Sequence, residues 1–459
     1  MPISPARAAA FDILLRVERE SSFASELLHS DAFNRLSTAD HALTTELVMG
    51  VLRWRSRLDD EIAGASSQPL SRLDLEVLIS LRLALYQFRW LDRIPARAAL
   101  HESVELVKRA HKRSAAPFVN AVLRKLSNKA PRPKPDPLCS SVPAVVNPQS
   151  PKALAATWSH PLWLVERWIT DYGPAIAEAI CRHNQTIPNT SLRLRTPEAE
   201  ASLQSEKIAL ASGALLSTAR TVHSGDITKS RAFRSRAIVI QDEASQLVAA
   251  LLGQSLPQGS RILDCCAAPG GKTLAIADQN PDAAITAAEL HPHRARLLQT
   301  LLAAAKARAQ IDVITADTRH LPLAAPFDRI LADVPCSGTG TLARNPEIKW
   351  RLTPADLAEL HDRQLSILRA ALAHVAPKGR LIYSTCSLEK EENENVVELA
   401  LAENKCFHLV DCGSELENLR AAGKLTWPDP ASLARGPYLR TIPGIHPCDG
   451  FFAAIVERF

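Results

Sequence analysis

Apolar residues recur every three or four positions through the first 128 residues, and this spacing predicts amphipathic helices. Near the start of the chain, Phe11, Leu14 and Leu15 fall on one face of such a helix. Glycine occurs only at positions 50 and 64 of this region, so little interrupts the helical pattern. We therefore expect residues 1–130 to form an all-α domain.

The pattern changes after this domain. Residues 131–151 contain seven prolines and no regular spacing of apolar positions. Proline fixes its own φ and restricts the residue before it, so this composition predicts an extended linker. Residues 152–238 mix helical stretches with short strands, and we expect them to form a small α/β region.

One strand of that region carries two arginines. In "TSLRLRT" (190–196), Arg193 and Arg195 alternate with leucines, so both arginines lie on one face of the strand. The pattern fits an exposed edge strand. It also fits a basic sheet face that contacts the phosphate backbone of a nucleic acid.

From residue 239 onward, strand-like runs alternate with helical stretches. This alternation is typical of βαβ units and predicts a parallel, doubly wound sheet of the Rossmann-like type in residues 239–459. Ligands of such sheets bind beyond the carboxyl ends of the strands. The strand-like runs are 261–267, 283–290, 312–317, 327–335 and 379–386.

The loop "DCCAAPGGKT" (264–273) follows the first of these runs and leads into a helix. Its end, Gly271 to Thr273, resembles the end of a phosphate-binding P-loop. That motif requires its first glycine at position 266, which is a cysteine here. This departure disfavours ATP as the ligand.

Two acidic residues indicate a different ligand. Glu289 ends the second strand-like run, where a carboxylate can bind the diol of a ribose. Asp317 ends the third run and could bind an adenine amino group. A nucleoside without phosphates needs no basic cradle, and S-adenosylmethionine meets this description.

Two cysteines follow later strand-like runs, Cys336 in "DVPCSGTG" and Cys386 in "YSTCS". Such a pair fits methylation of cytosine carbon 5, which becomes nucleophilic only after a thiolate adds to carbon 6. A second group must then assist the release of the thiolate. Asp333 could hydrogen-bond or protonate the N3 edge of the base. Cys266 is expected to pack beside the cofactor. The remaining cysteines are expected to be small buried hydrophobes: Cys139, Cys181, Cys265, Cys406, Cys412 and Cys448.

Composition narrows the setting in which this chemistry would occur. The nine cysteines form no C-x-x-C pair, which disfavours a disulfide framework and a structural zinc site and favours a reducing cytoplasm. No apolar run is long enough to span a membrane.

The net charge of +5 is uneven, with +9 on residues 1–240 and −4 on the rest. The basic excess indicates a polyanionic partner or ordinary solvated helix faces.

At these motifs the sequence resembles a known family. "DCCAAPGGKT", "DVPCSGTGTLARNPEIKW" and "YSTCSLEKEENENVV" resemble the RNA 5-methylcytosine methyltransferases of the NOL/NSUN/Sun class. The resemblance implies that Cys386 is the nucleophile, that Cys336 assists product release, and that the family commonly has Asp at the position of Glu289. It also implies an S-adenosylmethionine pocket formed by Cys266, Ala267, Ala268, Pro269, Gly270, Gly271, Lys272, Glu289, Asp317 and Asp333.

The N-terminal half narrows the resemblance to the RsmB-type branch of this class. "ELVMGVLRWRSRLDDEI" and "FVNAVLRKL" resemble its NusB-like domain, and "NTSLRLRT" and "VIQDEASQLVA" resemble its RNA-binding intermediate region. This implies methylation of 16S ribosomal RNA, free or in an early small-subunit particle, with no metal and no membrane. Two alternatives stay open: a methyltransferase of this class for tRNA or another RNA, and a NusB-like RNA-binding factor with a vestigial catalytic domain.

Overall fold

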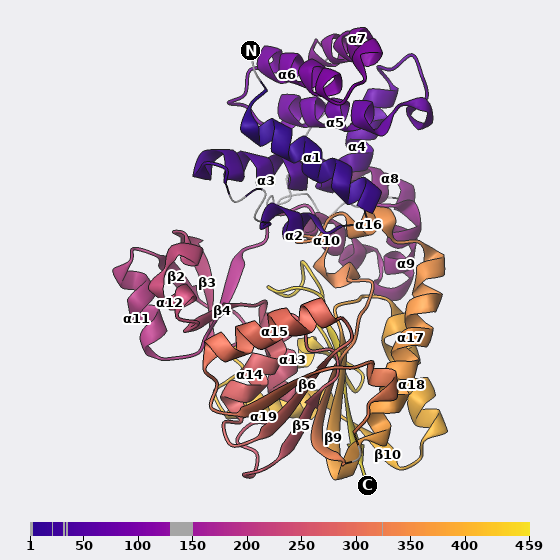
Figure 1. Ribbon diagram of the computed structural model, residues 1–459. Coiled ribbons are helices and arrows are strands. Elements are labelled where there is room, and N and C mark those ends of the chain that lie inside the picture. Colours follow the sequence, from indigo (N-terminus) through magenta and orange to yellow (C-terminus); the bar gives the residue numbers. More distant parts are fainter. Residues whose placement is uncertain (1–2, 21, 31–32, 34, 129–149, 324) are drawn as a thin grey trace. The chain divides into compact units, whose positions relative to one another are not determined.

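The computed structural model divides into two compact units (Figure 1). The helical unit comprises Met1–Ile187 and Leu342–Arg351, and the catalytic unit comprises Pro188–Thr341 and Leu352–Phe459. The predicted linker lies almost wholly outside the described residues, as does Cys139. The structure describes residues 3–20, 22–30, 33, 35–128, 150–323 and 325–459.

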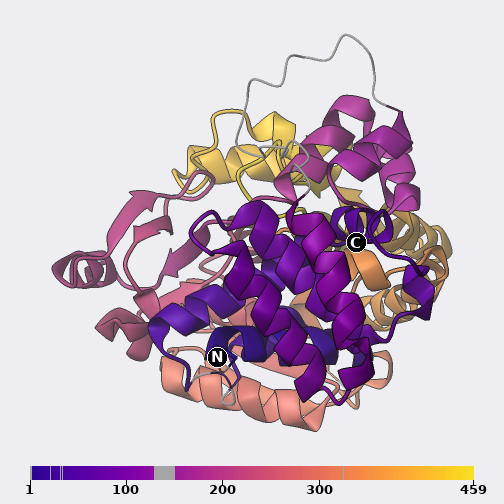
Figure 2. The same ribbon diagram turned by 90° about the horizontal axis from the view of Figure 1, so that it is seen from above.

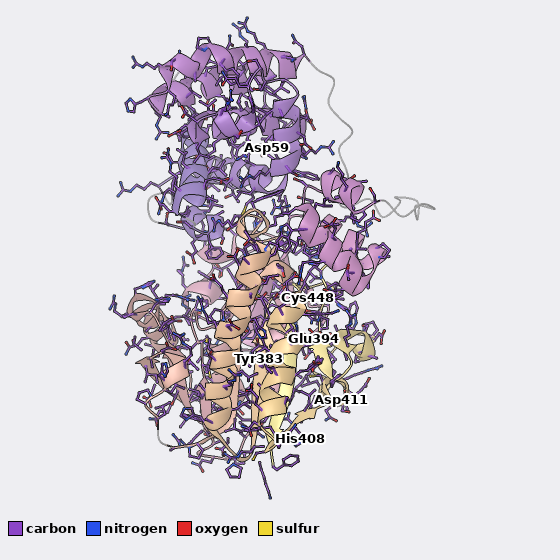
Figure 3. All side chains as sticks on the ribbon, turned by 90° about the vertical axis from the view of Figure 1, so that its right-hand side faces the viewer. Asp59, Tyr383, Glu394, His408, Asp411 and Cys448 are labelled. Atoms are coloured by element: carbon purple, nitrogen blue, oxygen red, sulfur yellow. The ribbon has the colours of Figure 1, made fainter. Side chains whose placement is uncertain are left out.

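The first part of the helical unit confirms the predicted all-α domain. Its helices pack side by side (Figure 2) because each buries an apolar stripe, such as Phe11, Leu14 and Val17 of the first helix. Asp59 accepts hydrogen bonds at 2.7 Å from both Nε and Nη2 of Arg82 (Figure 3). The helices are α1 (Pro5–Glu20), α2 (Ala24–Leu28), α3 (Thr38–Arg53), α4 (Arg55–Ala63), α5 (Leu75–Trp90), α6 (Ala96–Arg109) and α7 (Ala116–Ser127).

Two later segments also belong to the helical unit. One contains α8 (Pro151–Thr157), α9 (Leu162–Tyr172) and α10 (Pro174–His183), which the sequence patterns grouped with the following strands. The other is Leu342–Arg351, which includes the short helix α16 (Ile348–Arg351).

The segment Leu342–Arg351 is held by polar contacts with the first helices. Trp350 Nε1 donates to the carbonyl oxygen of Leu52 at 2.6 Å, and Lys349 Nζ donates to that of Arg53 at 3.0 Å. The Lys349 side chain is buried. This part of the chain is therefore an internal piece of the helical unit.

The catalytic unit begins with a small antiparallel sheet in the order β2-β3-β1-β4. β1 is an inner strand, so the prediction of an exposed edge strand is wrong. Arg193 and Arg195 do share one face, but Nη1 of the first and Nη2 of the second contact Asp278 at 2.7 and 2.8 Å. The interpretation as a phosphate-binding face is therefore also wrong. The elements are β1 (Thr190–Leu194), α11 (Glu198–Ser205), β2 (Ala209–Ser212), β3 (Ala219–Ser224), α12 (Arg231–Arg234) and β4 (Ile238–Ile240).

The large sheet confirms the predicted doubly wound architecture. Its path is β11-β12-β13-β9-β8-β5-β6-β7, in which β9, β8, β5, β6 and β7 are parallel. The sequence patterns missed the antiparallel strands after β9. The strands are β5 (Arg261–Asp264), β6 (Ala284–Glu289), β7 (Gln310–Thr315), β8 (Phe327–Asp333), β9 (Val375–Thr385), β10 (Phe407–Val410), β11 (Ala434–Arg435), β12 (Tyr438–Arg440) and β13 (Phe452–Arg458).

Helices cover both faces of this sheet (Figure 1). Ile262 and Ile382 face the core with α13, α14 and α19, whereas Leu263 and Leu381 face the core with α17 and α18. None of the described helices is long and apolar enough to cross a membrane. The helical elements are α13 (Glu243–Leu251), α14 (Gly271–Gln279), α15 (Pro292–Ala305), η4 (Thr318–His320), α17 (Pro354–Ala373), η6 (Lys390–Glu392), α18 (Glu394–Glu403) and α19 (Cys412–Ala421).

Candidate active site

A cavity of about 580 Å³ lies at the carboxyl ends of the parallel strands. This is where ligands of open α/β sheets bind, because the loops that follow neighbouring strands meet at one edge. Seven of the predicted site residues line it: Cys266, Ala268, Glu289, Asp317, Asp333, Cys336 and Cys386. The other lining residues are Cys265, Leu290, His291, Arg294, Thr318, Arg319, Val334, Pro335, Arg363 and Ile367.

The loop after β5 closes one side of this cavity. The amide of Ala267 donates to the carbonyl oxygen of Ala288 at 2.9 Å, which ties the loop to β6. Gly270 precedes α14 with φ +106°, and a Cβ at this position would come within 2.6 Å of Leu298 Cδ1. The positive φ favours glycine here, and a Cβ would also displace the end of the Leu298 side chain. Of the predicted pocket residues, five are not among the described residues that line the cavity: Ala267, Pro269, Gly270, Gly271 and Lys272.

The two acids predicted to bind the nucleoside lie on the same cavity. Glu289 is the last residue of β6, as predicted, and its Oε1 accepts a hydrogen bond from the amide of His291 at 2.9 Å. Asp317 lies two residues beyond β7 and caps η4. Hydrogen bonds from Arg319 lower the pKa of Asp317. A buried carboxylate at the end of β6, together with a cavity of this volume, fits the ribose and base of S-adenosylmethionine.

Asp333 ends β8, and each of its carboxylate oxygens accepts a hydrogen bond from a neighbouring side chain. Its Oδ2 accepts from Lys272 Nζ at 2.7 Å, and its Oδ1 accepts from Ser384 Oγ at 2.7 Å. Burial by itself would lower the pKa of Lys272, but Asp333 and, more weakly, Cys386 outweigh it, so the pKa of Lys272 is raised. The ammonium of Lys272 thus supplies positive charge near Cys386.

The structure brings the two predicted catalytic cysteines into contact. The Sγ atoms of Cys336 and Cys386 are 3.3 Å apart on the cavity wall, where one thiol donates to the other. The amide of Gly340 donates to the carbonyl oxygen of Cys386 at 2.9 Å, which joins the two loops directly. The contact arises because β8 and β9 are parallel neighbours, so their carboxyl ends lie side by side.

The two thiols have different electrostatic surroundings. The hydrogen bond with Cys386, followed by burial, raises the pKa of Cys336 well above its usual range. The carboxylate of Glu392 acts in the same direction. Cys386 instead lies close enough to the Lys272 ammonium to help raise the pKa of that lysine.

The remaining described cysteines lie apart from this pair. Cys181, Cys265, Cys412 and Cys448 are buried, as expected for small hydrophobes, but Cys406 is exposed. The expectation that Cys406 is buried is wrong, because it lies between α18 and β10 at the surface. Each of the eight described cysteines is a free thiol.

Several residues of the site were not singled out by the sequence patterns. Glu392, Ser337 and Ser387 form a buried cluster behind the cysteines. Asp264 accepts a hydrogen bond from Thr273 Oγ1 at 2.7 Å, and burial raises the pKa of its carboxyl group to about 7. The one signal in the sequence was the run of acidic and amide residues directly after Cys386.

Three known families match separate parts of the chain. Residues 253–457 match the family described as 16S rRNA methyltransferase RsmB/F, and residues 4–128 match the NusB family. Residues 160–219 match the ferredoxin-like domain of RsmF/B-like methyltransferases. The described folds therefore agree with a helical NusB-like domain, a small ferredoxin-like domain and an α/β methyltransferase domain.

Individual relatives extend over most of the chain. The probable ribosomal RNA small subunit methyltransferase B of Bacillus subtilis is 35% identical and covers 87% of this chain and 89% of its own length. The ribosomal RNA small subunit methyltransferase B of Vibrio cholerae is 30% identical over 98% of this chain and 97% of its own. The crystal structure of PH0851 shares the fold with a TM-score of 0.80 at 22% identity, and it covers 100% of both chains.

The fold, the strand-end cavity and these matches define an α/β methyltransferase joined to a NusB-like helical domain. The two relatives are 35% and 30% identical, and each match covers at least 87% of both chains. The chain belongs to the RsmB/F family of 16S rRNA methyltransferases.

Proposed function

We propose that this protein transfers a methyl group from S-adenosylmethionine to carbon 5 of a cytosine in 16S ribosomal RNA, through a covalent bond between Cys386 and carbon 6. The observation that carries the proposal is the pair of thiols 3.3 Å apart on the wall of the strand-end cavity. In this proposal the two cysteines serve two separate steps, attack and release. We place this activity in the cytoplasm.

The cofactor would lie along the ends of β5, β6 and β8. In this proposal the loop from Cys266 to Lys272 surrounds it, and Glu289 accepts hydrogen bonds from the ribose diol. Asp317, whose carboxylate also accepts a hydrogen bond from Arg319, would bind the adenine amino group. When bound, S-adenosylmethionine would supply the methyl group as a sulfonium electrophile.

Cys386 carries out the attack in this proposal. Its thiolate adds to carbon 6, which forms a C–S bond and moves an electron pair to carbon 5. Carbon 5 would use this pair to take the methyl group, while the S–CH3 bond of S-adenosylmethionine breaks and its electron pair stays on the departing sulfur. Removal of the carbon 5 proton returns the electron pair, and the C–S bond breaks. Cys336, in contact with Cys386, assists this last step, and its own thiol stays protonated during the attack.

Asp333 would orient the target base. Its carboxylate lines the cavity between Lys272 and Ser384. A hydrogen bond or proton transfer at the N3 edge would make carbon 6 a better target for the thiolate. The Lys272 ammonium, which contacts Asp333, would stabilise the charge that moves between sulfur, base and carboxylate.

The helical unit would dock the RNA. A groove of about 650 Å³ between α6 and α7 is lined by Arg97, His101, Lys108 and Arg124. Cations in a groove suit a phosphate backbone, because each contact releases condensed counterions. Replacing Arg97 and Arg124 by alanine should make the fall of log K for RNA binding with log salt less steep, by about two. The matched control is Lys152→Ala, an exposed lysine of the same unit.

Transfer of tritium from methyl-labelled S-adenosylmethionine tests the proposed function. We expect labelled 5-methylcytidine in unmodified 16S RNA, given either free or as an early small-subunit particle. Label in tRNA alone would support the alternative substrate. RNA binding without any transfer would support the alternative of a binding factor. Bisulfite sequencing of the labelled RNA would then identify the nucleotide.

A further inference from the structure

A single buried carboxylate lies behind both cysteine loops. Glu392, the last residue of η6, is fully buried. Its Oε2 accepts hydrogen bonds from the hydroxyl groups of Ser337 and Ser387, and its Oε1 accepts from the amide of Ser337 at 2.7 Å. Because these serines directly follow Cys336 and Cys386, one carboxylate binds the neighbour of each catalytic thiol.

The serine contact parallels the cysteine contact one residue earlier. Ser337 Oγ and Ser387 Oγ are 3.1 Å apart, and the sulfurs of Cys336 and Cys386 are 3.3 Å apart. Hydrogen bonds to a charged acceptor are short and directional, so a shift of either loop would break one of them. The separation of the sulfurs is therefore linked to the carboxylate.

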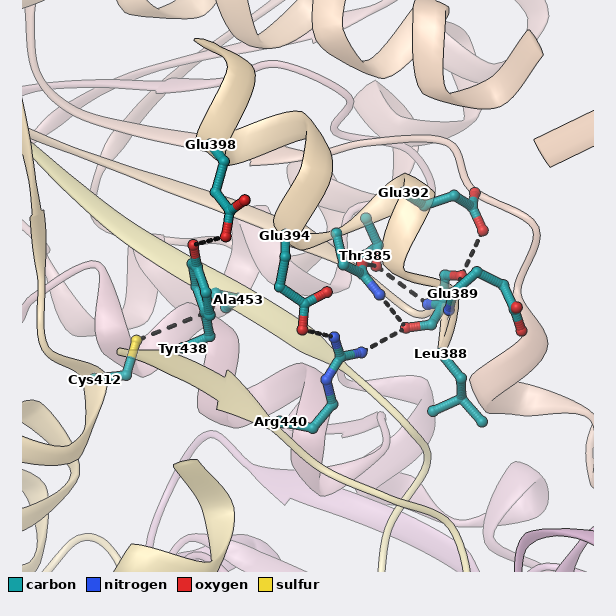
Figure 4. A network of polar contacts seen from close by, with 12 residues as sticks. Thr385, Leu388, Glu389, Glu392, Glu394, Glu398, Cys412, Tyr438, Arg440 and Ala453 are labelled. Carbon is teal, nitrogen blue, oxygen red and sulfur yellow. Dashed lines mark hydrogen bonds and ion pairs between the residues drawn. The ribbon is translucent and has the colours of Figure 1, made fainter. Parts of the chain in front are cut away.

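Glu392 is itself held on several sides. Gln364 of α17 donates to its Oε1 at 2.8 Å and also to the carbonyl oxygen of Pro335 at 2.9 Å. Tyr383 Oη donates to the Glu392 carbonyl oxygen at 2.6 Å. Figure 4 shows Glu392 in the same polar network as Thr385 and Arg440, and Arg440 Nη1 donates to the carbonyl oxygen of Ser387 at 3.2 Å. The carboxylate thus has a defined position relative to the sheet.

Glu392 does not reach the reacting groups. It is not among the described residues that line the cavity. Its negative charge is close enough to help raise the pKa of Cys336, after the larger effects of the Cys386 contact and of burial. A role through the cysteines, rather than on the substrate, follows from this placement.

We propose that Glu392 is a positioning residue that anchors Ser337 and Ser387 and thereby holds the Cys336 and Cys386 sulfurs in contact. The inference rests on the proposed function for its consequence in catalysis, but not for its geometry. The variant Glu392→Gln keeps the size of the side chain and removes the charge. Glu391→Gln makes the same change one residue earlier in the turn and is the matched control.

Crosslinking with diamide measures the contact without any methylation. Each crosslink forms one S–S bond from two S–H bonds, and two electrons and two protons pass to diamide. Peptide mapping by mass spectrometry identifies the bond between Cys336 and Cys386, in a chain with the exposed Cys406 changed to serine. We expect fast crosslinking in the parent protein and in Glu391→Gln, and crosslinking roughly ten-fold slower in Glu392→Gln.

Single-turnover methylation gives a second readout. Glu392→Gln should lower the rate of transfer roughly ten- to a hundred-fold, while the Kd for S-adenosylmethionine stays unchanged. If this variant fails to fold, Ser337→Ala and Ser387→Ala each remove one anchor. Both should slow crosslinking, and their effects should not add, because they act through one carboxylate.

Equal crosslinking and equal transfer rates in Glu392→Gln and the parent protein would overturn the inference. Failure of the parent protein to crosslink would also overturn it, since the sulfurs would then not be held together. If neither the parent protein nor any variant methylated cytosine, but Glu392→Gln crosslinked more slowly than Glu391→Gln, the inference would be supported and the proposed function rejected. The two failures are therefore distinguishable.

Discussion

The loops that carry Cys336 and Cys386 have similar sequences but different surroundings. Each cysteine follows the carboxyl end of a parallel strand, and each is followed by a serine that contacts Glu392. The nearby charge differs, because the Glu392 carboxylate acts on Cys336 and the Lys272 ammonium interacts with Cys386. A thiolate is thus disfavoured at Cys336, whereas a cation lies near Cys386, and the proposed division between release and attack uses this difference.

The two loops also continue differently along the chain. The Cys336 loop leads through Thr341 into Leu342–Arg351, which belongs to the helical unit. The Cys386 loop turns through η6 into α18 and stays within the catalytic unit. Similar local motifs therefore meet at one site although their following segments belong to different units.

The strongest test removes each thiol in turn. Cys386→Ala should abolish methylation without any covalent adduct, because the nucleophile is missing. Cys336→Ala should still attack and transfer the methyl group but stall before release, which would appear as a slowly migrating protein–RNA band in a denaturing gel. An adduct in Cys386→Ala but not in Cys336→Ala would exchange the two assignments. Normal turnover of Cys336→Ala would show that the Cys336 thiol only packs in the site and has no part in release.

Removal of the cation tests the electrostatic difference. Lys272→Met should lower the methylation rate at neutral pH about ten- to a hundred-fold, because the site loses a cation that can stabilise developing negative charge. Part of the lost activity should return as the pH rises, because alkaline pH favours thiolates in general. The pH–rate profile measures this, with the exposed Lys405→Met as control. A pH–rate profile of unchanged shape would show that Lys272 does not influence the attack by Cys386.

A change in the shared cavity should affect both cysteine steps alike. Glu289→Ala should weaken S-adenosylmethionine binding by about 1.5–3 kcal/mol, because a charged acceptor of hydrogen bonds is lost. This corresponds to a Kd roughly ten- to a hundred-fold higher, measurable by isothermal titration. Glu359→Ala, an exposed acid of α17, is the control. An unchanged Kd would show that Glu289 does not bind S-adenosylmethionine.

Alkylation gives the smallest expected difference. At pH 7.5, iodoacetamide should modify Cys386 several-fold faster than Cys336. The raised pKa of Cys336 keeps this cysteine in the less reactive thiol form at that pH. In Cys386→Ala the largest cause of this increase is absent, so Cys336 should react faster than in the parent protein. Mass spectrometry of the peptides compares the rates, with the exposed Cys406 as an internal reference. Equal rates for both thiols would contradict the electrostatic difference.

Much of the architecture could be predicted from local patterns. The spacing of apolar residues predicted the helices of the first 128 residues, because burial of one helix face imposes a period on the sequence. Short apolar runs between helical stretches predicted the parallel strands β5 to β9. The position of Glu289 at the end of β6 followed from the same pattern. The contact between Cys336 and Cys386 could be anticipated as well, since both end strands of one parallel sheet.

Contacts between distant segments were not predictable in this way. Arg193 and Arg195 alternate like residues of an exposed strand, but both form ion pairs with Asp278, on a helix more than eighty residues further along. Acidic side chains are seldom fully buried, but Glu392, in the acidic run after Cys386, is fully buried behind both cysteines. In each case the deciding partner lies on another element of the fold.

The sequence by itself determined the helical and parallel-strand elements and the chemistry of the strand-end residues, because these depend on local periodicity and on residue type. Only the tertiary structure decided which unit contains Leu342–Arg351, which strand lies inside the small sheet, and which charge acts on each thiol. The physical reason is that burial and electrostatic interaction depend on distance in space. Packing of the whole chain sets that distance, and it brings Glu392 to Cys336 and Lys272 to Cys386.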